Sequence, residues 1–302
     1  MRARTVALIV IVVVVAGLAV AAGWWIRYRP FAVFAFQTRR VLGAAGLARS
    51  AVASPVGEQV VFRGGSGPTL VLLHGAGDQA GTWSGVVPGL VKIHTLVVPD
   101  LAGHGGSAPA EGPISVPMLL DGVEAVIGEV AREQPVTVAG NSLGAWLAML
   151  VAHRHPEWVE RVVAINGGAI KGHRAVNLLP ADRAEARELM SLLRDPGSPK
   201  VPDWVLDDAV RLARVGPLAR FAATRDTMEE HTLDGRLGEL RVPVEIVWGA
   251  SDRLMPLDYA ERMRSELPDA RLMTVERCGH APQVECPDRL LAALRQALED
   301  RQ

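Results

Sequence analysis

The sequence has 302 residues, of which 49% are hydrophobic and 22% charged, with a formal net charge of -1 at neutral pH. This length allows one large domain or two small ones, and the near-zero charge gives no reason to expect a nucleic-acid partner. Two cysteines, Cys278 and Cys286, are too few for a disulfide framework and leave the redox compartment open. We expect two packed thiols rather than a bridge or a metal site.

The chain begins with a long uncharged segment. As a helix, residues 6–26 would span roughly 31 Å, close to the hydrocarbon thickness of a bilayer. Two tryptophans, a tyrosine and two arginines follow within residues 24–29, a mixture typical of a membrane–water boundary. We therefore predict an uncleaved single-pass anchor over residues 1–29. A cleaved secretory signal is the alternative, because residues 19–21 resemble a small-residue cleavage site.

The arginines around this segment bear on its orientation. Two arginines precede the apolar segment and four follow it closely, while the free N-terminal amine narrows the difference. Because positive residues favour the cytoplasmic side, the rest of the chain is predicted to be cytoplasmic. Residues 30–58 mix aromatic residues with arginines and are predicted to form a juxtamembrane linker. The linker would either lie along the bilayer surface or pack on the domain.

Residues 59–302 alternate between strand-like and helix-like segments, which predicts an α/β fold with a mostly parallel sheet flanked by helices. Strands are expected at residues 69–73, 94–98, 136–139, 159–165, 242–248 and 271–275. Helices are expected at residues 116–133, 258–267 and 288–301. The alternation lapses over about 167–239, a charged segment broken by prolines, which we predict to be a helical insertion that caps the sheet.

The motif Gly140-Asn141-Ser142-Leu143-Gly144 lies between a β-branched run and a run of good helix formers. A Gly-x-Ser-x-Gly between a strand and a helix is typical of a nucleophile elbow. The serine sits on a turn so tight that a side chain at either flank would clash, and the glycines relieve that crowding. The following helix directs its N-terminus at negative charge that develops beside the serine. Ser142 is therefore the predicted nucleophile.

A second glycine motif suggests a different function. Residues 75–80 fit the dinucleotide pattern Gly-x-Gly-x-x-Gly/Ala after a strand, and Asp100 ends the next strand, where a ribose-binding acid would lie. An NAD(P)-dependent oxidoreductase is thus an alternative. However, residues 81–88 make a poor helix, and this interpretation gives the elbow no role. The competing interpretation is that His74-Gly75 opens a loop whose backbone N–H groups stabilise an oxyanion.

Four further motifs follow predicted strands. They are His-Gly-Ala-Gly at 74–77, Asp-Leu-Ala-Gly-His-Gly-Gly-Ser at 100–107, an acid loop at 248–256 and a histidine loop at 278–285. Together with the elbow, in this order, they resemble those of the α/β-hydrolases from about residue 69 to 287. The resemblance implies the α/β-hydrolase fold and a serine hydrolase. We expect neither a cofactor nor a metal, because no motif for either holds up in the sequence.

A serine hydroxyl becomes a good nucleophile when a neighbouring base takes its proton. His280, on a glycine-containing loop after the last predicted strand, is the expected base. Asp252, also after a strand, is expected to orient the imidazole and stabilise its charged form. The chain order Ser, Asp, His is the one this fold uses.

The resemblance also implies an oxyanion hole. The N–H of Leu143, immediately after the nucleophile, is expected to supply one donor. The second donor is expected from Ala76, with Gly77 as the fallback. Asp100 and His104 are expected to brace their turn rather than to touch substrate.

The substrate class follows less directly. A serine nucleophile argues against the dehalogenases and epoxide hydrolases of this fold, which use aspartate. The pattern resembles lipases and esterases of the monoacylglycerol-lipase type with one N-terminal membrane helix, and also carbon–carbon-bond hydrolases of ring-cleavage products. The anchor favours the lipases, because lipid substrates partition into the bilayer. We therefore expect hydrolysis of carboxylic esters, monoacylglycerol or similar lipid esters, through an acyl-enzyme, with acyl chain, head group and oligomeric state left open.

Overall fold

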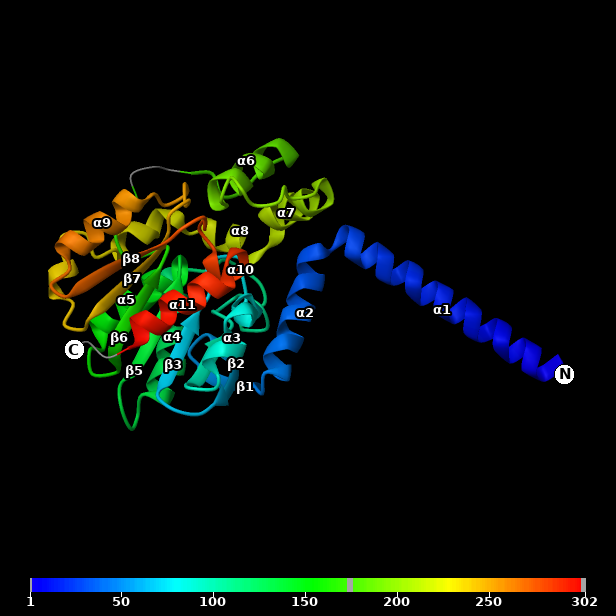
Figure 1. Cartoon of the computed structure of the whole chain (residues 1–302), viewed down its shortest axis with the longest axis horizontal. Helices are drawn as coiled ribbons and strands as arrows, with labels where there is room; N and C mark the ends of the chain where they lie inside the picture. Colours follow the sequence, from blue (N-terminus) through cyan, green and yellow to red (C-terminus); the bar gives the residue numbers. More distant parts are fainter. Residues whose placement is uncertain (1, 173–175, 300–302) are drawn as a thin grey trace.

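The computed structural model of the chain describes residues 2–172 and 176–299. Its centre is an eight-stranded sheet with the strand order β1-β2-β4-β3-β5-β6-β7-β8 (Figure 1). The strands are β1 (Ala48–Ser54), β2 (Gly57–Gly65), β3 (Thr69–Leu73), β4 (Thr95–Pro99), β5 (Val136–Asn141), β6 (Val159–Ile165), β7 (Val244–Gly249) and β8 (Ala270–Val275). Only the pairs β1–β2 and β2–β4 are antiparallel in this sheet, so the predicted mostly parallel α/β architecture is confirmed.

Helices cover both faces of the sheet. They are α1 (Arg2–Tyr28), α2 (Pro30–Ala44), α3 (Val87–Leu90), α4 (Val116–Val130), α5 (Leu143–Arg154), α6 (Arg183–Leu193), α7 (Asp203–Val215), α8 (Pro217–Ala222), α9 (Leu257–Glu266), α10 (Pro282–Glu285) and α11 (Pro287–Leu298), with short 3-10 helices η1 (Ala80–Gly85), η2 (Arg225–His231) and η3 (Leu237–Glu239). Alternate residues of β3 enter different cores: Leu70 and Leu72 pack with η1 and α11, whereas Val71 and Leu73 pack with α4 and α5.

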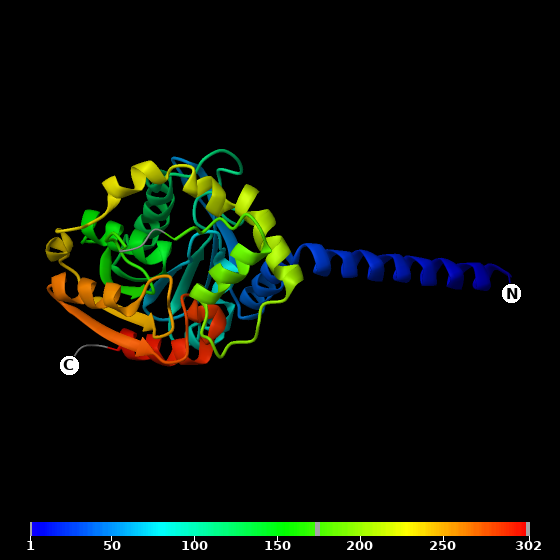
Figure 2. The same cartoon turned by 90° about the horizontal axis from the view of Figure 1, so that it is seen from above.

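The first helix stands apart from this domain. Figures 1 and 2 show α1 extending away from the sheet, with no other element along most of its length. Residues Val6–Tyr28 of α1 have a mean hydropathy of 3.0 and are 0% buried, and by length and composition they could cross a membrane. A signal sequence has the same properties, so the helix is a candidate span.

The expected linker over 30–58 is instead part of the domain. Its residues form α2 and β1, and β1 pairs with β2 along its whole length. Leu42 of α2 is fully buried, and the Arg39 guanidinium lies 2.9 Å from the carboxylate of Asp100. Leu42 and Arg39 thus fasten α2 to the domain, whereas Phe34 and Phe36 of the same helix stay exposed.

The insertion over 167–239 forms the helical cap, from α6 through η3, apart from residues 173–175, which lie outside the described residues. Figure 1 shows α7 next to the junction of α1 and α2, with α6 on the other side of α7. A buried carboxylate fixes this arrangement, because Asp208 of α7 accepts the backbone N–H of Phe31 at 3.2 Å.

The prediction of two packed thiols is wrong, because Cys278 and Cys286 form a disulfide with a Cα–Cα distance of 6.1 Å. The single turn of α10 reverses the chain between them and returns Cys286 to Cys278. Both cysteines are buried, and they close the segment that carries His280.

Candidate active site

Ser142 lies at the junction of β5 and α5 in a strained backbone conformation. Its φ of 54° and ψ of -115° are unusual for a residue with a side chain. A Cβ at Gly140 would clash with the backbone of Gly144, and a Cβ at Gly144 would clash with the carbonyl of Leu73. The two flanking glycines therefore permit the turn that presents the serine at the end of the sheet.

His280 and Asp252 form a buried pair in the loops after β8 and β7. The Nδ1 of His280 lies 2.7 Å from the Oδ2 of Asp252. Since a carboxylate can only accept, Nδ1 carries the hydrogen, which leaves Nε2 able to take a proton. Asp252 is 4% exposed, and backbone N–H groups of Leu254 and Met255 donate to its Oδ1, both at 2.9 Å. These donors stabilise the ionised carboxylate.

Asn166, which the sequence prediction missed, also orients the acid. Its Nδ2 donates to Oδ2 of Asp252 at 2.8 Å, and its Oδ1 accepts the N–H of Gly249 at 3.0 Å. The φ of Asn166 is 46°, a left-handed conformation that asparagine tolerates better than most residues. An asparagine directly after a predicted strand was the available sequence signal.

The histidine loop is fastened to the elbow. Asn141, next to the nucleophile, donates its Nδ2 to the carbonyl oxygen of His280 at 2.9 Å. The Nε2 of Gln283 donates in turn to Oδ1 of Asn141 at 3.0 Å. These two bonds hold the loop that carries the predicted base beside the predicted nucleophile. The sequence motifs include both amides, but nothing in the sequence indicated this connection.

Two buried histidines support the predicted oxyanion loop. The Nε2 of His74 accepts the N–H of Leu101 at 2.9 Å, and the Nε2 of His104 accepts the N–H of Gly77 at 3.1 Å. Each ring faces a carbonyl oxygen through Nδ1, so both rings are neutral Nδ1–H tautomers. Burial lowers the pKa of His74 to about 4 and that of His104 to about 3, because a buried imidazolium loses its hydration.

Asp100 braces the same region, as expected. It is 1% exposed, and its carboxylate accepts the N–H groups of Ala80 at 2.7 Å and Gly106 at 2.8 Å as well as the Arg39 guanidinium. The dinucleotide interpretation requires this acid to reach a ribose, but Asp100 is enclosed by protein donors. The residues after the glycines form the short 3-10 helix η1 rather than the long helix of that motif.

A cavity of about 650 Å³ opens beside the elbow. Ser142, Leu143 and Ala76 line it together with cap residues that are mainly apolar, among them Ile170, Leu178, Leu179, Leu218, Phe221 and Met228. Trp146, for which the sequence offered no role, also lines this cavity and donates its Nε1 to the carbonyl oxygen of His231 in the cap at 2.9 Å. Within residues 2–172 and 176–299, no group of three or more His, Cys, Asp or Glu side chains could hold a metal ion.

Comparisons with known proteins agree with this geometry. The model of the alpha/beta hydrolase family matches residues 70–293. A pimeloyl-[acyl-carrier protein] methyl ester esterase of Aromatoleum aromaticum is 31% identical over 73% of this chain and 94% of its own length. A 2-hydroxy-6-oxononadienedioate/2-hydroxy-6-oxononatrienedioate hydrolase of Cupriavidus pinatubonensis is 28% identical over 74% of this chain and 83% of its own.

Among solved structures, a membrane phospholipase A described as a bacterial virulence factor is 26% identical, with a TM-score of 0.75. The alignment covers 95% of this chain and 97% of that protein, so it reaches into the N-terminal helical segment as well as the sheet. The family match spans most of the chain and all five predicted motifs. The chain therefore belongs to the alpha/beta hydrolase family.

Proposed function

We propose that this hydrolase is anchored in a membrane and cleaves lipid esters, monoacylglycerol or similar molecules, through an acyl-enzyme on Ser142. The observation that carries the proposal is the cavity of about 650 Å³ that joins Ser142 to the apolar side chains of the cap. An acyl chain in this cavity would be removed from water while its carbonyl carbon lies at the serine.

The proposed chemistry assigns one step to each of the three residues. Nε2 of His280 accepts the proton of Ser142 as the serine oxygen attacks the ester carbonyl, and Asp252 stabilises the imidazolium that forms. The tetrahedral oxyanion takes hydrogen bonds from the N–H groups of Leu143 and Ala76. His280 then protonates the leaving alcohol, and water hydrolyses the acyl-enzyme by the same sequence of proton transfers.

Two observations support the choice of Leu143 and Ala76 as oxyanion donors. As the first residue of α5, Leu143 has an N–H with no acceptor inside the helix. The N–H of Gly77 already donates to Nε2 of His104, which favours Ala76 over Gly77 as the second donor.

The anchor would bring the cap close to the lipid. Arg27, in the last turn of α1, lies 3.9 Å from the carboxylate of Asp207 in cap helix α7. The likeness to a membrane phospholipase A over 95% of the chain supports both the anchor and an ester substrate from the bilayer. We propose that the cap mouth faces the bilayer and receives single-chain lipids directly from it.

The membrane face is proposed from the disulfide. The arginine count predicts a cytoplasmic domain, but disulfides persist in oxidising compartments and are rare in the cytosol. The bond between Cys278 and Cys286 therefore favours the non-cytoplasmic face, and we give it more weight because the arginine excess is small.

Carbon–carbon-bond hydrolysis is the second candidate, since one relative is named for that activity on a dicarboxylate. Such a substrate needs cations for its carboxylates. Lys171 and Arg225 line the cavity, but Lys171 already pairs with Glu229 at 2.6 Å. The mainly apolar lining favours the acyl ester.

A substrate panel tests the proposal. The full chain would be assayed on p-nitrophenyl esters of increasing acyl length, on monoacylglycerols and on a 2-hydroxy-6-oxo-dienoate. We expect ester hydrolysis that rises from acetyl to medium chains and includes monoacylglycerol. Turnover of the dienoate alone would contradict the proposal and support the second candidate.

A further inference from the structure

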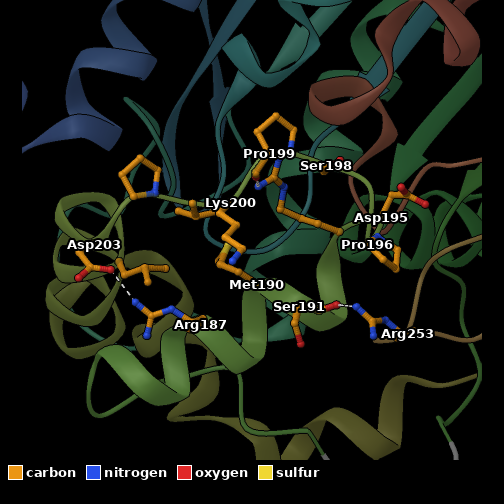
Figure 3. A pocket seen from close by; sticks show the side chains of 14 residues that line it. Arg187, Met190, Ser191, Asp195, Pro196, Ser198, Pro199, Lys200, Asp203 and Arg253 are labelled. Carbon is orange, nitrogen blue, oxygen red and sulfur yellow. Dashed lines mark hydrogen bonds and ion pairs between the residues drawn. The ribbon is translucent and has the colours of Figure 1, made fainter.

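A second cavity lies in the cap, separate from the cavity around Ser142. It measures about 450 Å³ and is bounded by α6, the loop 194–202, the first turn of α7 and Arg253 of the acid loop. Figure 3 shows Arg187 and Asp203 at one end of it, and Arg253 and Asp195 at the other. None of the described residues that line this cavity also lines the one around Ser142.

The lining carries an excess of positive charge. Four cationic side chains face two carboxylates: Arg187, Arg194, Lys200 and Arg253 against Asp195 and Asp203. Both carboxylates are already engaged, Asp195 by the hydroxyl of Ser251 at 2.5 Å and Asp203 by Arg187 at 2.5 Å. Within the described part of the chain, Lys200 has no hydrogen-bond or ion-pair partner. Its ammonium group is thus available to an anion.

The same cavity also has an apolar lining. Leu206, which is 1% exposed, closes the floor of the cavity, and the half-buried Met190 and Val201 with the prolines of the loop supply the accessible apolar surface. Figure 3 shows Lys200 next to Met190 in the centre of the cavity. A cation over apolar side chains suits a ligand that combines an anionic group with hydrocarbon.

A series of ion pairs connects the cavity to the end of α1. Arg27 pairs with Asp207 at 3.9 Å, Asp207 with Arg183 at 2.7 Å, Arg183 with Asp203 at 3.1 Å, and Asp203 with Arg187 at 2.5 Å. Asp203 and Asp207 lie about one helical turn apart, roughly 5.4 Å. Because the apolar part of α1 ends at Tyr28, this places the cavity near the headgroup layer, which is roughly 5–8 Å thick on each side of a bilayer.

We propose that this cavity binds the headgroup of an anionic phospholipid from the membrane that holds α1. Lys200 and Arg253 contact the phosphodiester, and the glycerol end of the lipid lies along Met190 and Val201. The lipid is a ligand rather than a substrate, because the cavity does not include Ser142. The inference rests on the proposed anchor and is independent of the proposed substrate.

Photo-crosslinking of the full chain in vesicles tests this site. The vesicles consist of phosphatidylcholine with a small fraction of a photoactivatable phosphatidylglycerol whose chains are ether-linked, so that ester hydrolysis cannot remove the probe. Peptide mapping is expected to find the probe within residues 187–203. The variant Lys200→Glu should lower this labelling by about tenfold or more, as expected when a charge-assisted hydrogen bond is lost. Lys200→Arg should retain it.

Three controls separate the outcomes. Alkaline extraction first verifies that α1 is inserted, so failure of the anchor is seen before the probe is used. Lys92→Glu, which removes an exposed cation outside the cavity, should leave labelling unchanged. Equal labelling by a phosphatidylcholine probe, equal labelling of Lys200→Glu, or displacement of the lipid probe by millimolar inorganic phosphate would overturn the proposed lipid site.

Discussion

Asn166 donates its side-chain amide to the same carboxylate oxygen of Asp252 that His280 contacts, at 2.8 and 2.7 Å respectively. The asparagine follows β6 and the aspartate follows β7, so the neighbouring parallel strands place the two side chains together. Since the N–H of Gly249 fixes the other end of the amide, Asn166 holds Asp252 in one orientation toward the histidine.

This contact predicts a loss of catalysis when Asn166 is replaced by glycine, which tolerates the positive φ of this position. Removal of one hydrogen bond to a buried carboxylate costs roughly 1.5–3 kcal/mol. We therefore expect kcat on a p-nitrophenyl ester to fall by about tenfold to a hundredfold, with KM little changed. The control Arg277→Gly, at an exposed position that also has a positive φ and does not line the cavity around Ser142, should retain kcat. Wild-type kcat in Asn166→Gly would contradict a positioning role.

The buried histidines predict that the protein loses stability in acid. The folded state keeps His74 and His104 neutral, with pKa values of about 4 and 3, while the unfolded chain gains protons below about pH 6.5. The free energy of unfolding therefore falls as the pH decreases from 6.5 towards 4, by up to about 1.4 kcal/mol per pH unit for each histidine. Burial raises the pKa of Asp78 to about 6, so this carboxyl takes up a proton more readily in the folded state than in the unfolded chain. Asp78 therefore opposes the loss of stability in acid, but it is one group against two histidines.

Denaturant unfolding between pH 7 and pH 5 measures this slope. His104→Gln keeps an acceptor for the N–H of Gly77 but cannot take up the proton, so its stability should depend less steeply on pH. An identical slope in wild type and His104→Gln would contradict the assignment of His104 as a neutral, buried brace.

The disulfide predicts both stability and location. The double variant Cys278→Ser/Cys286→Ser loses the bond that closes a loop between cysteines eight positions apart. This loss is expected to lower the free energy of unfolding by about 2–3 kcal/mol. Because the loop carries His280, kcat should fall as well. In cells, a maleimide mass tag should modify the denatured full chain only after reduction. Tagging of both cysteines before reduction would contradict the non-cytoplasmic location.

Removal of the anchor tests how substrate arrives. Because α2 and β1 belong to the domain, the shortened chain must begin near Arg29 rather than at the start of β1. Full and shortened enzymes should hydrolyse a soluble short-chain ester at equal rates. On monoacylglycerol in vesicles, direct capture from the bilayer predicts a large loss for the shortened enzyme. Equal rates on the vesicle substrate would reduce α1 to a tether.

Patterns within single segments predicted much of this fold. The strands β3 and β6 have the expected ends, because continuous apolar runs mark strands that are buried on both faces. In contrast, β1 was missed since it is an edge strand in which Val52 alone is buried, so it shows no alternation. The position of α2 depends on the ion pair of Arg39 with Asp100, which local sequence does not reveal.

In the site, too, residues within local motifs were predicted, whereas contacts between distant segments were not. Ser142, His280 and Asp252 were predicted because their motifs follow strands, and the structure pairs His280 with Asp252. The role of Asn166 arises from a contact between separate loops, so periodicity and local motifs could not indicate it. The disulfide joins cysteines eight residues apart, and their approach depends on the chain reversal at α10, which the local pattern did not reveal.

The central claim, an acyl-enzyme on Ser142 activated by His280, is tested most directly by a fluorophosphonate probe and peptide mass spectrometry. A single label is expected on Ser142 of the folded full chain, with no label in Ser142→Ala and almost none in His280→Ala. Both variants should keep the thermal stability of the wild type to within a few degrees. Labelling of another residue, or unchanged ester hydrolysis by Ser142→Ala, would contradict the account.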